Sequence, residues 1–236
     1  MPDLLVSVRS FSEYQTVAAE DVGIIDFKEP RKGALSPVDP TLWYQVASFT
    51  QKGASRQFES AKLSAALGES DDYKSIVDQL PSEFQYAKVG PCGIDSKEEL
   101  LPLWEAVRAR LPKTTELVAV AYADHAAALC LPPIEIFVLA HKLGFRRCLL
   151  DTFTKHGQTT FDHLTIDELL ELQQCARESG MKWALAGSLT RQLAQEANRK
   201  GIAPDCYAVR GDVCRDGRTS ELSVERLRNW VLNHPG

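Results

Sequence analysis

Asp26 and Lys28 are the residues whose types and spacing most directly suggest chemistry. They end the segment 22–28, an apolar, β-branched run that is typical of a buried strand. Side chains alternate along a strand, so Asp26 and Lys28 share one face, while Phe27 lies on the other. A buried carboxylate beside a buried amine either forms a neutralising ion pair with a structural role or takes part in catalysis.

Other charged and polar residues stand at the ends of further apolar segments. In a closed parallel barrel these ends meet on one rim, where the active sites of this architecture lie. Each residue alone is most simply read as a solvated strand end, but the convergence of several lysines with several aspartates favours a site. The residues that join Asp26 and Lys28 are Glu69, Lys88, Tyr122, Asp124, Asp151, Lys155 and Arg210.

A lysine in such a site has two usual roles, which are to hold a phosphate or to attack a carbonyl and form a Schiff base. The second role needs a neutral amine, so the ordinary lysine pKa of about 10.4 must be lowered by burial or by a second cation. We expect Lys28 and Lys88 to lower each other's pKa, with Asp26 and Asp151 as proton relays. Lys28 is the favoured nucleophile because it shares a strand face with Asp26, and Lys88 is the alternative.

The last two predicted strands end in small residues. One ends in Gly187 and Ser188, and the other ends in Gly211, which follows Arg210. In barrels, the loops after strands seven and eight often bind a phosphate through backbone N–H groups, and glycine permits its close approach. The alternative is that these glycines only terminate strands. The small-residue turns at both positions, with an arginine beside one of them, favour phosphate binding.

Eight apolar segments that read as strands alternate with helical segments, and no linker separates them. The predicted strands are residues 4–8, 22–28, 61–68, 86–90, 116–124, 147–152, 183–188 and 206–211. The predicted helices are residues 12–20, 39–49, 72–80, 98–110, 133–143, 165–179, 189–200 and 223–233. This alternation predicts an α/β protein with one domain over residues 1–236, folded as a single (β/α)8 TIM barrel.

The composition narrows the class of protein. A net charge of −5 over 236 residues argues against nucleic-acid binding, while small anionic substrates remain compatible with a locally positive pocket. We expect a cytoplasmic protein because no leader segment and no apolar run long enough to cross a membrane is present. Six scattered cysteines indicate reduced thiols, and no Cys/His spacing predicts a metal site.

The motifs resemble one family, (5-formylfuran-3-yl)methyl phosphate synthase, which makes the furan precursor of methanofuran and methylofuran. The resemblance runs through nearly the whole chain, and its most specific segments are 24–30 and 184–188. It rests on residues 4–7, 24–26 with Lys28, Pro30, Gly33 and Leu35, 63–65 with Gly68, 88–90 with Gly93, 122–124, 150–152 with Lys155 and Gly157, 184–188 and 209–211.

The resemblance implies a lyase that condenses two glyceraldehyde 3-phosphate molecules to a phosphorylated furan aldehyde, with loss of phosphate and water. Carried over by position, Lys28 resembles the Schiff-base lysine, and Asp26, Lys88, Asp151 and Lys155 its catalytic companions. The substrate-binding or phosphate-binding set is Gly187, Ser188, Arg210, Gly211, Asp124 and Tyr122. No cofactor or metal is expected, because a lysine imine already serves as the electron sink.

Two alternatives stay open. A Schiff-base aldolase acting on another sugar phosphate would use the same lysine but form a reversible carbon–carbon bond and no furan. A non-catalytic barrel that binds a phosphorylated ligand would not need the complete lysine–aspartate set. The segments 50–59 and 214–221 depart from the family pattern, which leaves assembly into a homo-oligomer and the second triose pocket open.

Overall fold

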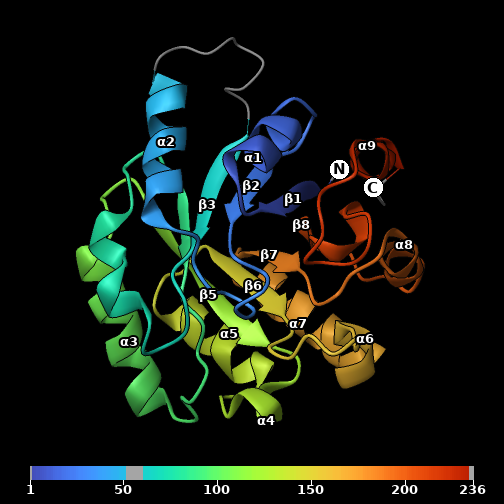
Figure 1. The fold of residues 1–236 in the computed structure, drawn as a ribbon. Coiled ribbons are helices and arrows are strands. Elements are labelled where there is room, and N and C mark those ends of the chain that lie inside the picture. Colours follow the sequence, from blue (N-terminus) through green and yellow to red (C-terminus); the bar gives the residue numbers. More distant parts are fainter. Residues whose placement is uncertain (1, 52–60, 234–236) are drawn as a thin grey trace.

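Eight parallel strands close into a barrel in which each strand pairs with its sequence neighbours and β8 pairs with β1. The computed structural model describes residues 2–51 and 61–233, so most of the segment 50–59 lies outside the described residues. Figure 1 shows the strands at the centre with helices around them. The strands are β1 (Asp3–Val8), β2 (Ile24–Phe27), β3 (Lys62–Ala66), β4 (Tyr86–Lys88), β5 (Glu116–Tyr122), β6 (Arg147–Asp151), β7 (Lys182–Leu185) and β8 (Cys206–Val209).

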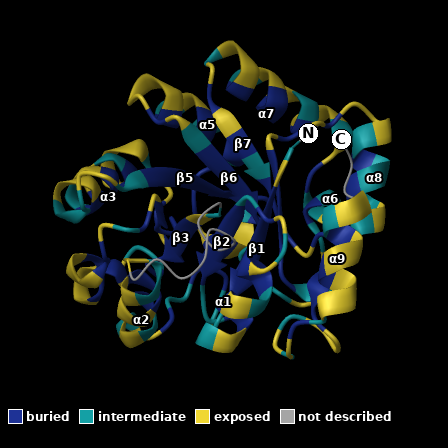
Figure 2. Ribbon diagram, turned by 90° about the horizontal axis from the view of Figure 1, so that it is seen from above, coloured by how far each residue is buried: buried dark blue, intermediate teal, exposed yellow. Residues whose placement is uncertain are grey.

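The helices form an outer ring that covers the barrel (Figure 2). The α-helices are α1 (Phe11–Ala18), α2 (Pro40–Gln51), α3 (Lys97–Arg110), α4 (His125–Ala128), α5 (Pro133–Lys142), α6 (Thr160–His163), α7 (Ile166–Glu178), α8 (Arg191–Arg199) and α9 (Val224–Asn233). Within residues 2–51 and 61–233, three short 3-10 turns accompany them: η2 (Tyr73–Ser75), η3 (Val77–Gln79) and η4 (Gly211–Val213). This architecture confirms the predicted (β/α)8 fold.

Alternation along the strands produces two cores. Ile24 belongs to a cluster inside the barrel, together with Leu5, Tyr86 and other inward residues. Ile25 and Phe27 belong to the larger cluster between the strands and the helices. Both faces of β2 are therefore buried, which explains its nearly continuous apolar sequence and leaves Asp26 fully inside the barrel.

The segment 72–80 differs from the predicted helix and forms the two separate turns η2 and η3. Its buried residues Tyr73, Val77 and Leu80 have the spacing of a helix face, which explains the prediction. Leu80 precedes Pro81 and takes an extended conformation, with φ −74° and ψ 122°, as residues before proline usually do. The helical hydrogen bonding therefore cannot continue, and short turns replace it.

The described residues contain neither a membrane span nor a cluster of metal ligands. Over residues 2–51 and 61–233, no helix is long and apolar enough to cross a membrane. In the same part of the chain, no three His, Cys, Asp or Glu side chains gather closely enough to hold a metal ion.

Candidate active site

A cavity of about 370 Å³ opens at the carboxyl ends of the strands, a volume within the range of small-molecule sites. It is walled mainly by β1, β2 and the segments that follow β6, β7 and β8. The structure brings to this cavity every predicted catalytic and phosphate-binding residue except Tyr122 and Asp124, and Glu69 of the predicted rim also lies outside its lining. The lining members of the predicted set are Asp26, Lys28, Lys88, Asp151, Lys155, Gly187, Ser188, Arg210 and Gly211.

Asp26 pairs with Lys88, and not with Lys28 as its strand face suggested. Lys88 Nζ donates to Oδ1 of Asp26 at 2.5 Å, and the Ser7 hydroxyl donates to Oδ2 at 3.3 Å. Both charged side chains are almost fully buried, with 4% of the Lys88 side chain and 1% of the Asp26 side chain exposed. They come from β2 and β4, alternate strands whose inward residues share a layer of the barrel. The pair therefore neutralises itself at the floor of the cavity.

Lys28 faces a second carboxylate, Asp151 at the end of β6. The Nζ atom of Lys28 lies 3.8 Å from Oδ2 of Asp151, and 12% of the lysine side chain is exposed to the cavity. Lys155 donates to the other carboxylate oxygen at 2.7 Å, and the N–H of Thr152 donates to it at 2.8 Å. Asp151 is thus held by Lys155 and Thr152, while the amine of Lys28 forms only a loose ion pair with it.

The surroundings lower the pKa of Lys28 to about 8. Burial is the largest cause; the nearby Lys155 and the more weakly acting Lys88 lower the pKa further, while Asp151 and Asp26 oppose the shift. The direction agrees with the sequence-based expectation, although Lys155 contributes more than Lys88. Burial alone would raise the pKa of Asp151, but Lys155 and Lys28 hold it well below its usual range. Near neutral pH the site thus combines an ionised carboxylate with an amine that deprotonates readily.

The turn after β7 presents backbone donors to the cavity. Gly187 has φ +89° and Ser188 has φ +53°, and the Cβ of any side chain at Gly187 would collide with Oγ1 of Thr160. The N–H groups of Gly187, Ser188 and Gly211 donate to no other residue in the described ranges. Close to them, Thr190 caps α8 and lines the cavity. Free N–H groups near a helix N-terminus suit an anion, so the phosphate site at this turn stays a prediction that the geometry allows.

Arg210 lines the cavity, but its predicted contact with phosphate needs correction because the protein occupies all five of its N–H donors. It forms two hydrogen bonds with the carboxylate of Glu13 in α1 and donates to the carbonyl oxygen of Ser7 at 3.0 Å. It also donates to the carbonyl oxygens of Arg218 and Ser220, each at 3.0 Å. Arg210 therefore holds the chain that follows β8 against β1 and α1.

Tyr122 and Asp124 also need correction, because neither lines the cavity. The Tyr122 hydroxyl donates to Glu69 at 2.7 Å, and burial raises the pKa of Glu69 to about 7. Asp124 accepts hydrogen bonds from the N–H groups of Phe153 and Thr154, at 2.6 and 2.8 Å, and from the Thr154 hydroxyl. Asp124 thus fixes the loop that carries Lys155, whereas Tyr122 contacts Glu69 outside the cavity.

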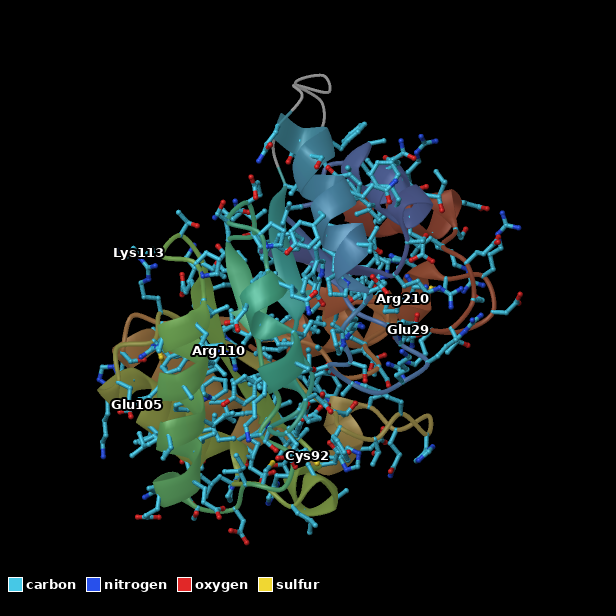
Figure 3. All side chains as sticks on the ribbon, turned by 60° about the vertical axis from the view of Figure 1, so that its left-hand side comes forward. Glu29, Cys92, Glu105, Arg110, Lys113 and Arg210 are labelled. Atoms are coloured by element: carbon cyan, nitrogen blue, oxygen red, sulfur yellow. The ribbon has the colours of Figure 1, made fainter. Side chains whose placement is uncertain are left out.

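Sequence reasoning missed several polar residues of the site, among them Ser7, Glu13 and Arg218. Ser7 and Arg218 line the cavity, and Glu13 neutralises Arg210. Figure 3 shows Arg210 on the same flank as Glu29, which lies in the loop after β2, whereas Arg110 and Lys113 lie on the far side of the barrel. The inward position of Ser7 on β1 follows from strand alternation, but no sequence signal distinguishes Arg218 from the exposed arginines around it.

Solved structures share this fold. The chain is similar to phosphoribosyl anthranilate isomerase from Thermus thermophilus, with a TM-score of 0.62 and 12% identity over 98% of this chain and 97% of that one. It is also similar to a structure of 3-hexulose-6-phosphate synthase, with a TM-score of 0.55 and 12% identity over 96% and 98% of the two chains. At such low identity these similarities show the barrel fold alone.

Curated relatives are closer in sequence. The chain is 31% identical to (5-formylfuran-3-yl)methyl phosphate synthase of Methanococcus maripaludis strain S2, over 94% of each chain. It is 29% identical to the protein of the same name from Methanothermobacter thermautotrophicus, again over 94% of each chain. A family model described as 4-HFC-P synthase matches residues 4–231. The chain therefore belongs to the 4-HFC-P synthase family.

Proposed function

We propose that this protein condenses two molecules of glyceraldehyde 3-phosphate to (5-formylfuran-3-yl)methyl phosphate, in the synthesis of methanofuran or methylofuran cofactors. The observation that carries the proposal is the position of Lys28, whose amine is accessible from the cavity and has a pKa of about 8 beside an ionised Asp151. Family membership supplies the reaction, and this lysine supplies the nucleophile that it needs.

The overall reaction balances without an oxidant or reductant. Two triose phosphates contain all the carbon of the furan product, and the remaining atoms leave as one phosphate and two waters. One triose forms an imine with Lys28 through its aldehyde carbon, and loss of its phosphate from the enamine leaves an enol whose terminal carbon is nucleophilic. This carbon attacks the ketone carbon of dihydroxyacetone phosphate, the isomer of the second triose, which gives the branched carbon skeleton of the product. Ring closure, loss of two waters and hydrolysis of the imine then release the furan aldehyde and free Lys28.

Lys28 is favoured over Lys88 as the imine-forming residue. Lys88 donates to Asp26 at 2.5 Å in a buried ion pair, so its proton is held by a carboxylate. Lys28 is 3.8 Å from its carboxylate and faces the cavity. Asp151 lies closest to the Lys28 amine and is suited to carry protons to and from the carbinolamine and the enamine. Lys155 keeps Asp151 ionised and oriented.

The proposal is tested by incubating the purified protein with D-glyceraldehyde 3-phosphate and following furan absorbance, product mass and released phosphate. We expect one phosphate released for each furan formed. Lys28→Ala should abolish the product, whereas Lys113→Ala, which removes an exposed lysine beyond the end of α3, should leave the rate unchanged. Formation of a sugar phosphate by a reversible carbon–carbon bond, with no furan, would instead support an aldolase. Binding of the triose without any reaction would support a non-catalytic barrel.

A further inference from the structure

The chain between β8 and α9 forms a small hairpin over the cavity, residues 214–222. Cys214 and Leu222 form an isolated antiparallel bridge, and the N–H of Arg215 donates to the carbonyl oxygen of Glu221 at 3.0 Å. The turn contains Gly217, which has φ +80°. The function proposed above assigns this segment no role.

The hairpin is anchored to the barrel through the buried side chain of Arg210. Two of the five donors of Arg210 bind its backbone, at the carbonyl oxygens of Arg218 and Ser220. The other three fix Arg210 to Glu13 and to the backbone of Ser7. The buried guanidinium of Arg210, with all five N–H donors in hydrogen bonds, therefore sets the position of the turn relative to β1 and α1.

This anchoring places the Arg218 side chain at the cavity wall. Its Nη2 atom donates to the carbonyl oxygen of Gly33 at 2.9 Å, which ties it to the loop after β2. Its other N–H donors have no acceptor among the described residues, and no carboxylate forms a salt bridge with it there. Arg218 is half-buried and lies within the electrostatic range of Asp151 and Glu29. A partly desolvated arginine with free donors is well suited to bind a phosphate.

Three of the other cations of the cavity are already paired with carboxylates. Lys88, Lys155 and Arg210 bind Asp26, Asp151 and Glu13, and Lys28 is needed as a neutral amine. Two triose phosphates carry about three to four negative charges together near neutral pH. The N–H groups after β7 and β8 account for one phosphate, and the second needs a separate counter-charge. Arg218, with Arg226 of α9 at the same cavity, is available to supply it.

We propose that Arg218 binds the phosphate of the second triose, the one attacked by the Lys28-bound triose, in a subsite separate from the N–H groups that follow β7 and β8. This inference rests on the proposed function for the identity of the ligand. The existence of the subsite has a consequence that does not depend on the reaction. The protein should bind two phosphate monoesters at once, and the binding of only one of them should depend on Arg218. Arg210 and Glu13 are positioning residues for this subsite.

Calorimetric titration with sn-glycerol 3-phosphate, a three-carbon phosphate ester without a carbonyl, tests the subsite directly. The unaltered protein should bind two equivalents. Arg218→Gln should weaken one of the two sites at least about tenfold and leave the other unchanged. Arg215→Gln, which removes the same charge from an exposed position of the same hairpin, should bind like the unaltered protein. Two sites of unchanged affinity in Arg218→Gln would overturn the proposal, as would a single site in the unaltered protein.

A second readout separates this inference from the proposed function. Arg218→Gln should still give a borohydride-reduced adduct at Lys28 with the first triose, while its furan formation falls at least about tenfold. Loss of the adduct together with the furan would overturn the assignment to the second triose. Failure of the unaltered protein to form furan would contradict the proposed function, while the titration would still decide whether the subsite exists. If Arg218→Gln does not fold, Arg218→Lys takes its place and should weaken the same site only.

Discussion

Lys28 and Lys88 line one cavity but differ in how their charge is compensated. Lys88 lies in a short, buried ion pair with Asp26, whereas Lys28 shares Asp151 with Lys155 and reaches it only loosely. The loose ion pair therefore does not offset the cost of burying a charged amine at position 28, and the pKa of Lys28 is lowered to about 8. The two lysines are therefore not interchangeable, although both line the same cavity.

The pH dependence of the reaction should report the neutral amine. Because the amine must be unprotonated to attack a carbonyl, kcat/KM should rise about tenfold per pH unit below the Lys28 pKa and level off above about 8. The measurement should begin at pH 7, above the second ionisation of a phosphate ester near about 6. A profile that is flat between pH 7 and 8 would mean that Lys28 does not supply the nucleophile in its free form.

Burial of the Lys28 amine should also lower the free energy of unfolding near neutral pH. A lysine whose folded pKa lies below its unfolded value of 10.5 destabilises the fold fully below about pH 8, and the penalty disappears as the pH rises toward 10.5. Lys28→Met should therefore raise the free energy of unfolding at pH 7, by roughly 1–2 kcal/mol, and lose that advantage near pH 10.5. Urea denaturation at both pH values checks this. A Lys28→Met variant that is less stable than the unaltered protein at pH 7 would contradict the account.

At the residue scale, the sequence predicts which face a side chain occupies but not its partner. Alternation correctly placed Asp26 inside the barrel and Phe27 outside it. The partner of Asp26 was missed because it comes from β4, 62 residues away, and is determined by the stagger of the strands. The occupied donors of Arg210 were likewise not predictable, since Glu13 reaches them from another element.

At the scale of elements, the turn after β7 shows how a loop conformation prepares a binding site. Gly187 takes a conformation that other residues rarely adopt, and it lies against Thr160, whose hydroxyl donates to the carbonyl oxygen of Ala186 at 2.8 Å. A methyl group there would both strain the backbone and displace α6. The free N–H groups of this turn therefore depend on glycine at position 187.

Gly187→Ala should weaken binding of sn-glycerol 3-phosphate at the site that does not depend on Arg218, and should destabilise the fold by about 1–3 kcal/mol. Gly93→Ala is the matched control, because Gly93 has φ +79° but open space where an added Cβ would lie. The control should be destabilised only by the backbone strain and should bind both phosphate esters normally. Equal effects of the two substitutions on binding would contradict the steric explanation. The measurements are calorimetric titration and thermal unfolding.

The element pattern was predictable where short, nearly continuous apolar runs marked the strands, as in all eight of them. It failed at residues 72–80, because Tyr73, Val77 and Leu80 have helical spacing while Pro81 prevents the helix from continuing. The short helices α4 and α6, of four residues each, carry too few apolar positions to leave a periodic signal. Such insertions lie in the loops at the carboxyl ends of the strands, where sequence patterns give the least information.

At the scale of the whole molecule, closure of the barrel assembles the site. Asp26 and Asp151 come from β2 and β6 on different sides of the barrel, and Lys28 reaches across it toward Asp151. The seam between β8 and β1 is reinforced by Arg210 and Glu13, which are 197 residues apart in the chain. The location of the site at the carboxyl rim was predictable from the fold class. The hairpin that carries Arg218 was not, because its position depends on that seam.

Borohydride reduction in the presence of glyceraldehyde 3-phosphate, read by intact mass and peptide mapping, tests the central claim most directly. We predict one reduced adduct per chain, located on Lys28, with Lys88 unmodified because its amine is held in the buried ion pair with Asp26. The exposed Lys113 serves as an internal control for nonspecific reduction. A folded protein that binds the triose phosphate but carries no adduct on Lys28, or carries it on Lys88 instead, would contradict the account.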